Sequence, residues 1–233
     1  SGATTFDGEP YFALCTSNST QQFGFSGSNF GVTSHYIDFG DGVDTVFGSF
    51  PNLPTQIEHT YPAPGLYQLK YAGLGSNGCW DTIYRKVFFG TNPAGGIASV
   101  GNSQGCVGTT LPFIISNTSS NPSGTIYVLN YNDGTPADTF SHPPPDTVYH
   151  TYNVGSCGFD VLDNGGNVDY ADAFETSLEV RNPCNRTSSN VSPIYISEPT
   201  VAGFEWNVPI CVGSQVTFRD TSDGGTNPFV GDC

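Results

Sequence analysis

Short residue patterns recur along this 233-residue chain at nearly constant spacing, and this repetition restricts its fold more than any other feature. The patterns are an alternating segment that ends in Asp-Gly, a His-Thr-Tyr triplet, and a cysteine ahead of an alternating segment. The Asp-Gly segment occurs at residues 36–42 and 128–134, and the triplet at residues 59–61 and 150–152. The cysteine occurs three times, as Cys15, Cys106 and Cys211. The two triplets are 91 residues apart, and so are the first two cysteines. Such a chain is expected to fold as tandem copies of one small domain.

The second copy is longer than the first. Cys79 and Cys184 are 105 residues apart, so about 14 extra residues lie between His150 and Cys184. The loop-like, acidic stretch at residues 158–173 is their expected place. We therefore predict a first domain, a longer second domain with an inserted loop, and the N-terminal part of a third. These cover residues 1–92, residues 93–199 with the insertion near 158–173, and residues 200–233.

The third copy is incomplete in this sequence. So short a piece of a sandwich cannot bury a core by itself. Either the parent chain continues beyond Cys233, or a neighbouring chain completes the sandwich by strand pairing, which would make this chain a filament subunit. Of these alternatives, continuation of the chain is favoured.

Composition favours β-structure. The chain contains 29 Gly and 17 Pro, which favour turns, and 17 Phe and 12 Tyr, which favour strands. An Asp-Gly step at the end of an alternating segment predicts a hairpin. About seven short strands fit into each repeat, as in an immunoglobulin-like sandwich. The expected class is all-β, with tandem immunoglobulin-like β-sandwich domains.

Charge and cysteine usage indicate an extracellular protein. The net charge is −15 with only six Lys and Arg, so the surface repels nucleic acid and anionic membranes. No apolar run is long enough to predict a transmembrane helix. The seven cysteines include no CxxC pair, which argues against a zinc ribbon or a redox site. They predict structural disulfides formed in an oxidising compartment.

One stretch carries a family resemblance. Residues 38–42 (DFGDG), followed about 16 residues later by residues 59–67 (HTYPAPGLY), resemble the PKD (polycystic kidney disease) domain. The second copy departs from this pattern, with residues 132–134 (NDG) and a triplet that leads into residues 155–158 (GSCG). This variant resembles the PKD-like repeats of very large secreted Bacteroidetes proteins, including gliding-motility-associated adhesins exported by the type IX secretion system. The resemblance implies immunoglobulin-like modules that act as spacers, adhesion units or substrate-binding appendages of secreted hydrolases.

The disulfides are predicted within each repeat. Cys15 precedes an early strand and Cys79 follows a late one, and Cys106 and Cys184 hold the equivalent places in the second repeat. We therefore expect Cys15 to pair with Cys79, and Cys106 with Cys184. Each bond would close a loop of about 65–80 residues and stabilise the domain by about 4 kcal/mol on the loop-entropy model.

The three other cysteines have no settled partners. Cys157 belongs to the second repeat alone and is an alternative partner for Cys184. Cys211 would pair with a late-strand cysteine beyond the sequence, or with Cys233. A structural role is expected for all seven cysteines.

Carboxylates cluster at the Asp-Gly turns. Asp38, Asp41 and Asp44 lie within seven residues of one another, and Asp133 and Asp138 stand in the matching place of the second repeat. Oxygen ligands at this density suit Ca²⁺, so the first three residues are the candidate metal site. The acidic insertion is a weaker candidate. The alternative is that Asp41 and Asp133 form turns and bond their own backbone.

The histidines do not predict an enzyme. His59 and His150 recur at the same repeat position, whereas a catalytic residue is seldom duplicated in tandem. The adjacent Tyr61 and Tyr152 are expected to pack in the manner of a tyrosine corner. The chain has no GxSxG or HExxH motif, and no cofactor is predicted apart from calcium.

The bacterial resemblance also implies glycosylation. Bacteroidetes attach O-glycans to Ser or Thr that follow Asp and precede an apolar residue. Four threonines fit this pattern: Thr45, Thr82, Thr139 and Thr147.

The function expected from the sequence is a non-catalytic structural or adhesive region of a cell-surface or fibre protein. Its expected partners are other domains of the same long chain, further copies in a fibre, or surface glycans and proteins. One alternative is a carbohydrate-binding accessory region of a secreted hydrolase, which would need exposed aromatics such as Trp80 and Trp206. However, Trp80 follows Cys79 directly and is expected to pack near a disulfide. A second alternative is the filament subunit completed by strand exchange.

Overall fold

Alternating apolar residues and Gly/Pro turns give short strands throughout the computed structural model. The structure describes residues 4–24, 31–48, 55–206, 212–213 and 215–233. Within these ranges the regular elements are strands, apart from the 3₁₀ turn η1 (Pro228–Val230). No helix in the described residues has the length and apolar character needed to cross a membrane.

We call β1–β8 the first unit. Its strands are β1 (Thr4–Phe6), β2 (Glu9–Leu14), β3 (Thr20–Gly24), β4 (Val32–Asp38), β5 (Asp44–Gly48), β6 (Gln56–Thr60), β7 (Gly65–Gly75) and β8 (Trp80–Phe89). Six strands form one sheet in the order β1-β2-β8-β7-β4-β5, and β3 pairs with β6 in a second. The apolar side chains of both sheets meet in one core, which includes Phe23 from β3 and Ile37 from β4.

We call β9–β18 the second unit. Its strands are β9 (Gly96–Ser99), β10 (Gln104–Cys106), β11 (Thr110–Ser116), β12 (Ile126–Asn130), β13 (Asp138–Ser141), β14 (Thr147–Thr151), β15 (Val161–Leu162), β16 (Val168–Tyr170), β17 (Phe174–Asn182) and β18 (Asn185–Ser197). Its two main sheets have the orders β10-β18-β17-β12-β13 and β14-β11-β9. A separate core between them includes Phe113 and Leu178, both fully buried.

The two units share one strand plan. In each, a short strand runs parallel to the last strand, as β2 does to β8 and β10 to β18. The ribbon β3–β6 corresponds to β11–β14, and β7-β4-β5 corresponds to β17-β12-β13. The second unit adds the hairpin β15–β16 between β14 and β17. The predicted all-β, immunoglobulin-like and disulfide-stapled class is confirmed.

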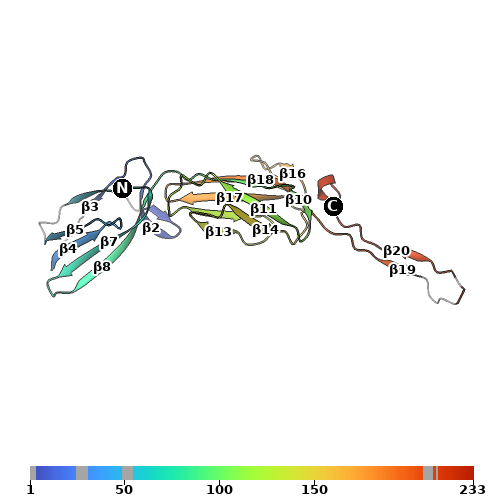
Figure 1. Cartoon of the computed structure of the whole chain (residues 1–233), viewed down its shortest axis with the longest axis horizontal. Helices are drawn as coiled ribbons and strands as arrows, with labels where there is room; N and C mark the ends of the chain where they lie inside the picture. Colours follow the sequence, from blue (N-terminus) through green and yellow to red (C-terminus); the bar gives the residue numbers. More distant parts are fainter. Residues whose placement is uncertain (1–3, 25–30, 49–54, 207–211, 214) are drawn as a thin grey trace.

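The units lie end to end, and a two-stranded arm extends beyond them (Figure 1). The arm consists of β19 (Phe204–Trp206) and β20 (Phe218–Asp220), which pair with each other in antiparallel fashion. Among the described residues no further strand joins this pair. The chain then returns to the second unit, where η1 and the C-terminus lie (Figure 1).

Candidate functional site

The Asp-Gly turn of the first unit is held by its own carboxylates. Oδ1 of Asp38 accepts a hydrogen bond from the Gly40 N–H at 2.8 Å, and Oδ1 of Asp41 accepts one from the Val43 N–H at 3.1 Å. Gly40 has φ +83°, and a Cβ there would lie 2.6 Å from the Gln68 carbonyl oxygen. Only glycine meets both conditions, which is why the pattern contains it.

A buried Asp–His pair joins this turn to the other sheet. Nε2 of His59, on β6, donates to Oδ2 of Asp41 at 2.7 Å, and both side chains are almost fully buried. The imidazole stacks on Phe39 with ring centroids 3.9 Å apart, and it meets the edge of Tyr61 at 4.7 Å. We call Phe39, Asp41, His59 and Tyr61 the first cluster.

The second unit contains the same arrangement. His150 donates to Asp133 at 2.7 Å, stacks on Tyr131 at 3.5 Å and meets Tyr152 edge-on at 4.7 Å. We call these four residues the second cluster. Burial opposes ionisation of Asp133, but hydrogen bonds from Thr135 and His150 outweigh it and hold the Asp133 pKa below its ordinary value. In each unit the aspartate lies in a turn between two strands of one sheet and the histidine lies on a strand of the other, so the pair joins the two sheets of the sandwich.

The predicted tyrosine corners differ between the units. Both tyrosine side chains are fully buried, as expected. The Tyr152 hydroxyl lies 2.8 Å from Oγ1 of Thr176 on β17, whereas the Tyr61 hydroxyl has no hydrogen-bond partner among the described residues.

The candidate calcium residues face different partners. Asp38 bonds its own turn, Asp41 bonds His59, and Oδ2 of Asp44 accepts a hydrogen bond from the Tyr36 hydroxyl at 2.9 Å. Their carboxylate oxygens do not gather within 4.8 Å of one another. The turn-forming alternative therefore describes the contacts of Asp41, and calcium binding by these three residues stays a prediction.

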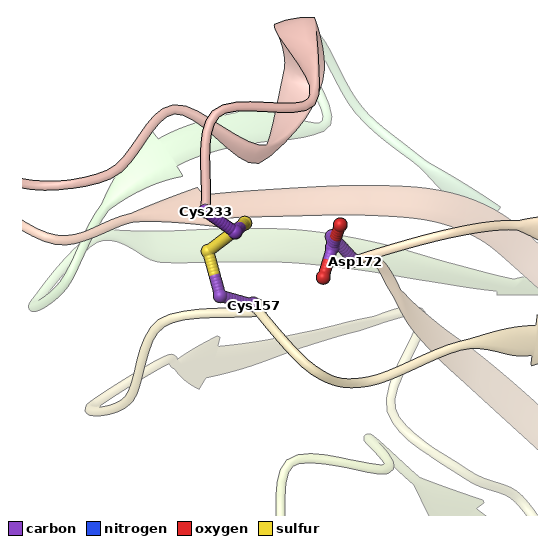
Figure 2. Close-up of side chains that lie close together, drawn as sticks. All are labelled: Cys157, Asp172 and Cys233. Carbon is purple, nitrogen blue, oxygen red and sulfur yellow. A yellow bond between two sulfur atoms is a disulfide. The ribbon is translucent and has the colours of Figure 1, made fainter.

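One group of metal-ligand types does gather among the described residues: Cys157, Asp172 and Cys233 (Figure 2). The two sulfurs form a disulfide, so neither presents a thiolate to a metal ion. Oδ1 of Asp172 accepts a hydrogen bond from the Gly158 N–H at 2.7 Å. This group therefore ties the C-terminal residue to the acidic insertion of the second unit.

The predicted disulfide pairings are wrong. Cys15 bonds Cys184, and Cys79 and Cys106 are free and exposed. The reason is strand direction. β2 runs parallel to the ten-residue β8, so Cys15 lies beside the end of β8 whereas Cys79 lies before its start, about 30 Å away. A disulfide requires Cα atoms within about 7 Å.

The same geometry separates the cysteines of the second unit. Cys106 lies opposite Ser197 at the end of β18, and Cys184 precedes the start of this 13-residue strand. Their separation is about 40 Å along the strand. Cys184 is therefore at the end of the second unit that faces the first, where Cys15 reaches it.

The Cys15–Cys184 bond is part of a wider junction between the units. Asn182 donates from Nδ2 to the Thr91 carbonyl oxygen at 3.0 Å, and Arg181 lies 3.1 Å from the Asp7 carboxylate. On the other side, Oγ of Ser123 accepts a hydrogen bond from the Leu66 N–H at 3.0 Å. The junction thus combines a covalent bond with polar contacts from several loops.

The remaining predicted residues lie apart from these sites. Trp80 is 54% exposed and its neighbour Cys79 is unpaired, so the expectation that it packs against a disulfide is wrong. Cys211 lies outside the described residues. The four candidate O-glycosylation sites stand on strands β5, β8, β13 and β14, where Thr139 is exposed and Thr45, Thr82 and Thr147 are half-buried. Their glycosylation stays a prediction.

Each unit also holds a His–Tyr pair. Nδ1 of the fully buried His35 lies 2.6 Å from the Tyr71 hydroxyl, and Nδ1 of His142 lies 3.0 Å from the Tyr127 hydroxyl. Burial lowers the pKa of both histidines. Protonation therefore favours the unfolded chain, in which histidine keeps its ordinary pKa near 6.5.

We expect the first unit to lose stability as the pH falls below about 6.5, because His35 must then bind a proton on unfolding. His35→Gln should flatten this part of the pH dependence in the first unit, and His142→Gln should do so in the second. Calorimetry between pH 7.5 and 5 measures both transitions. Identical pH slopes in wild type and variants would contradict the assignment.

Comparisons with known proteins add little to this geometry. No protein-family model and no curated protein sequence matches the chain. Among solved structures, the Clostridium thermocellum CbhA fibronectin(III)-like modules match at 14% identity and TM-score 0.31, over 81% of this chain and 89% of that one. Murine CEACAM1b matches at 11% identity and TM-score 0.34, over 81% and 95%. Likenesses at this level carry no inference about function.

Proposed function

We propose that this chain is a non-catalytic structural and adhesive repeat region of an extracellular bacterial surface or fibre protein, of the PKD-like type found in Bacteroidetes. The Cys15–Cys184 bond carries the proposal. It joins two sandwiches that already have separate cores, so its effect is to fix how one unit sits on the next. Such a bond restricts bending at the junction of an extracellular rod, and an oxidising compartment permits it.

The duplicated clusters support a non-catalytic role. Each Asp–His pair is enclosed by aromatic rings, and the Asp133 side chain is fully buried, so no substrate reaches it. A reaction centre needs an open face to its substrate. The chain's acidic surface, with net charge −15, suits a solvated extracellular array.

Antibodies raised against this chain test the location and shape. They are expected to label intact cells of the source organism, and brief protease treatment of those cells should remove the label. The released protein should form rods in negative-stain electron microscopy. Label confined to the cytoplasmic fraction, with Cys15 recovered as a free thiol, would contradict the proposal.

A carbohydrate-binding role is the second candidate, favoured by the aromatics of the arm. Phe204, Trp206 and Phe218 are each more than half exposed, and the Phe204 and Phe218 rings lie 5.3 Å apart. Exposed rings of this kind can stack on sugars. A pull-down on chitin and cellulose decides between the structural and the carbohydrate-binding roles. Retention of the protein that is lost in Trp206→Ala but kept in the control Trp80→Ala would favour carbohydrate binding.

A further inference from the structure

Four cysteines occupy two kinds of position, and each unit has one cysteine at each kind of position. Cys15 and Cys106 stand at the end of the short strand that runs parallel to the last strand. Cys79 and Cys184 stand directly before the last strand, each in a turn where an asparagine Oδ1 accepts the cysteine N–H. The distances are 3.0 Å for Asn77 and 2.9 Å for Asn182. Each unit therefore carries one cysteine of each kind, at opposite ends of its long sheet.

The bonded pair uses one cysteine of each kind, from neighbouring units. Cys15 is at the forward end of the first unit and Cys184 at the rear end of the second. This leaves Cys106 at the forward end of the second unit and Cys79 at the rear end of the first, both exposed and free. Each is the equivalent of a cysteine that is bonded elsewhere in the same molecule.

The arm marks the start of a third unit at the forward end. Phe113 and Phe218 each stand seven residues after the recurring cysteine. Phe218 on β20 lies opposite Trp206 on β19, as Phe113 on β11 lies opposite Ser99 on β9. The linkers have equal length, since residues 90–95 join β8 to β9 and residues 198–203 join β18 to β19. β19–β20 therefore corresponds to the pair β9–β11 that begins the second unit, and its aromatic side chains are exposed.

The segment after β20 also docks as its counterpart in the second unit does. In the second unit, Asn121 Oδ1 accepts a hydrogen bond from the linker N–H of Ala94 at 2.8 Å. At the forward end, Oγ1 of Thr226 accepts a hydrogen bond from the linker N–H of Glu198 at 2.9 Å, and Phe229 packs edge-on against Tyr195 of β18. At both junctions a side chain from the segment after the ribbon strand thus accepts a hydrogen bond from a linker N–H, although the two linker positions differ. The forward end also carries the Cys157–Cys233 disulfide, which has no counterpart at the first junction among the described residues.

We propose that Cys106 forms a disulfide with a cysteine that directly precedes the last strand of the third unit of the same chain. The junction between the second and third units then carries the same kind of bond as the junction between the first and second units. This inference rests on the proposed repeat-region function. Its test identifies thiol partners, whereas the surface-labelling experiment tests the function itself.

The bond forms by thiol–disulfide exchange. The Cys106 thiolate attacks a sulfur of an oxidant disulfide, and the thiol of the third unit then displaces the oxidant from the mixed disulfide. Two cysteine thiols become one disulfide, and the oxidant disulfide takes up two electrons and two protons as two thiols. The partner belongs to the same chain because the linker holds the third unit at this end, which gives its cysteine a high effective concentration.

Peptide mapping of the native full-length protein tests the proposal. Free thiols are alkylated under denaturing conditions, the unreduced protein is digested, and linked peptides are identified by mass spectrometry. We expect the Cys106 peptide to be linked to a peptide from beyond residue 233 in which cysteine precedes an alternating segment. Alkylated Cys106, or a link from Cys106 to Cys79 or Cys211, would overturn the proposal.

Two variants separate a bond within the chain from one between chains. Cys106→Ser should expose one new alkylatable thiol in the third unit, whereas the matched control Cys79→Ser should leave the Cys106 link intact. Both side chains are exposed, so neither change should disturb folding. A ladder of oligomers on a non-reducing gel that Cys106→Ser abolishes would overturn the same-chain assignment and favour the filament subunit.

Discussion

Asp133→Ala is expected to unfold the second unit at a much lower temperature while the first unit keeps its wild-type transition. The change leaves the buried His150 without its hydrogen-bond partner and removes the two bonds that Thr135 makes. Removing one partner of a buried ion pair lowers the free energy of unfolding by about 3–5 kcal/mol. For a domain of about 100 residues this lowers the midpoint by on the order of 15 °C or more.

Calorimetry of the intact chain measures this effect, because the two separate cores should give two transitions. Asp41→Ala is the matched control and should lower the transition of the first unit alone. Asp133→Asn keeps an acceptor for His150 and should lose less stability than alanine. A fall of only a few degrees in Asp133→Ala, or an equal fall of both transitions, would show that the cluster does not hold the sandwich together.

Removing the bond between the units should greatly lengthen the chain under force. Consider a molecule pulled through handles at its N-terminus and at Thr200. The Cys15–Cys184 bond spans 169 residues, so force passes across it and the enclosed units cannot extend. In Cys15→Ser/Cys184→Ser both units lie in the path of the force. Their unfolding should add on the order of 600 Å of contour length, at about 3.5 Å per residue.

Single-molecule force spectroscopy reports this length directly. Wild type treated with a reducing agent should behave like the double variant. Cys106→Ser, which alters no bonded cysteine, should behave like untreated wild type. Full extension of the untreated wild-type protein would mean that Cys15 and Cys184 are not joined in solution.

Much of the fold could be predicted from the sequence. The repeated motifs indicate the length of one unit, and the alternation of apolar and polar residues indicates the strands. The Asp-Gly turns and the His-Thr-Tyr triplets stand on equivalent strands in the two units. The Asp–His pairs could also have been predicted from the sequence. Asp41 precedes His59 by nearly the same interval as Asp133 precedes His150, and two residue types that recur together at fixed spacing indicate a contact.

The cysteine partners could not be predicted in this way. Sequence spacing shows that Cys15 and Cys106 are equivalent, but it does not show that the strand before each cysteine runs parallel to the last strand. If that strand were antiparallel, Cys15 would have lain near Cys79, and the predicted pairing would have been possible. Strand direction is a property of the assembled sheet, and it decides here between a bond inside a unit and a bond between units.

The opposite placement of the two cysteines in each unit also bears on how such a protein can evolve. Each of the two units has one kind of cysteine at its forward end and the other kind at its rear end. Under the proposed bonding, a junction therefore needs no cysteine that is peculiar to one unit. Duplication or deletion of a whole unit within the gene then keeps every internal junction matched. An exchange that cuts a unit in half instead leaves unmatched thiols. Under the proposed bonding, the number of units could therefore change over evolution while the disulfide at each junction stays the same.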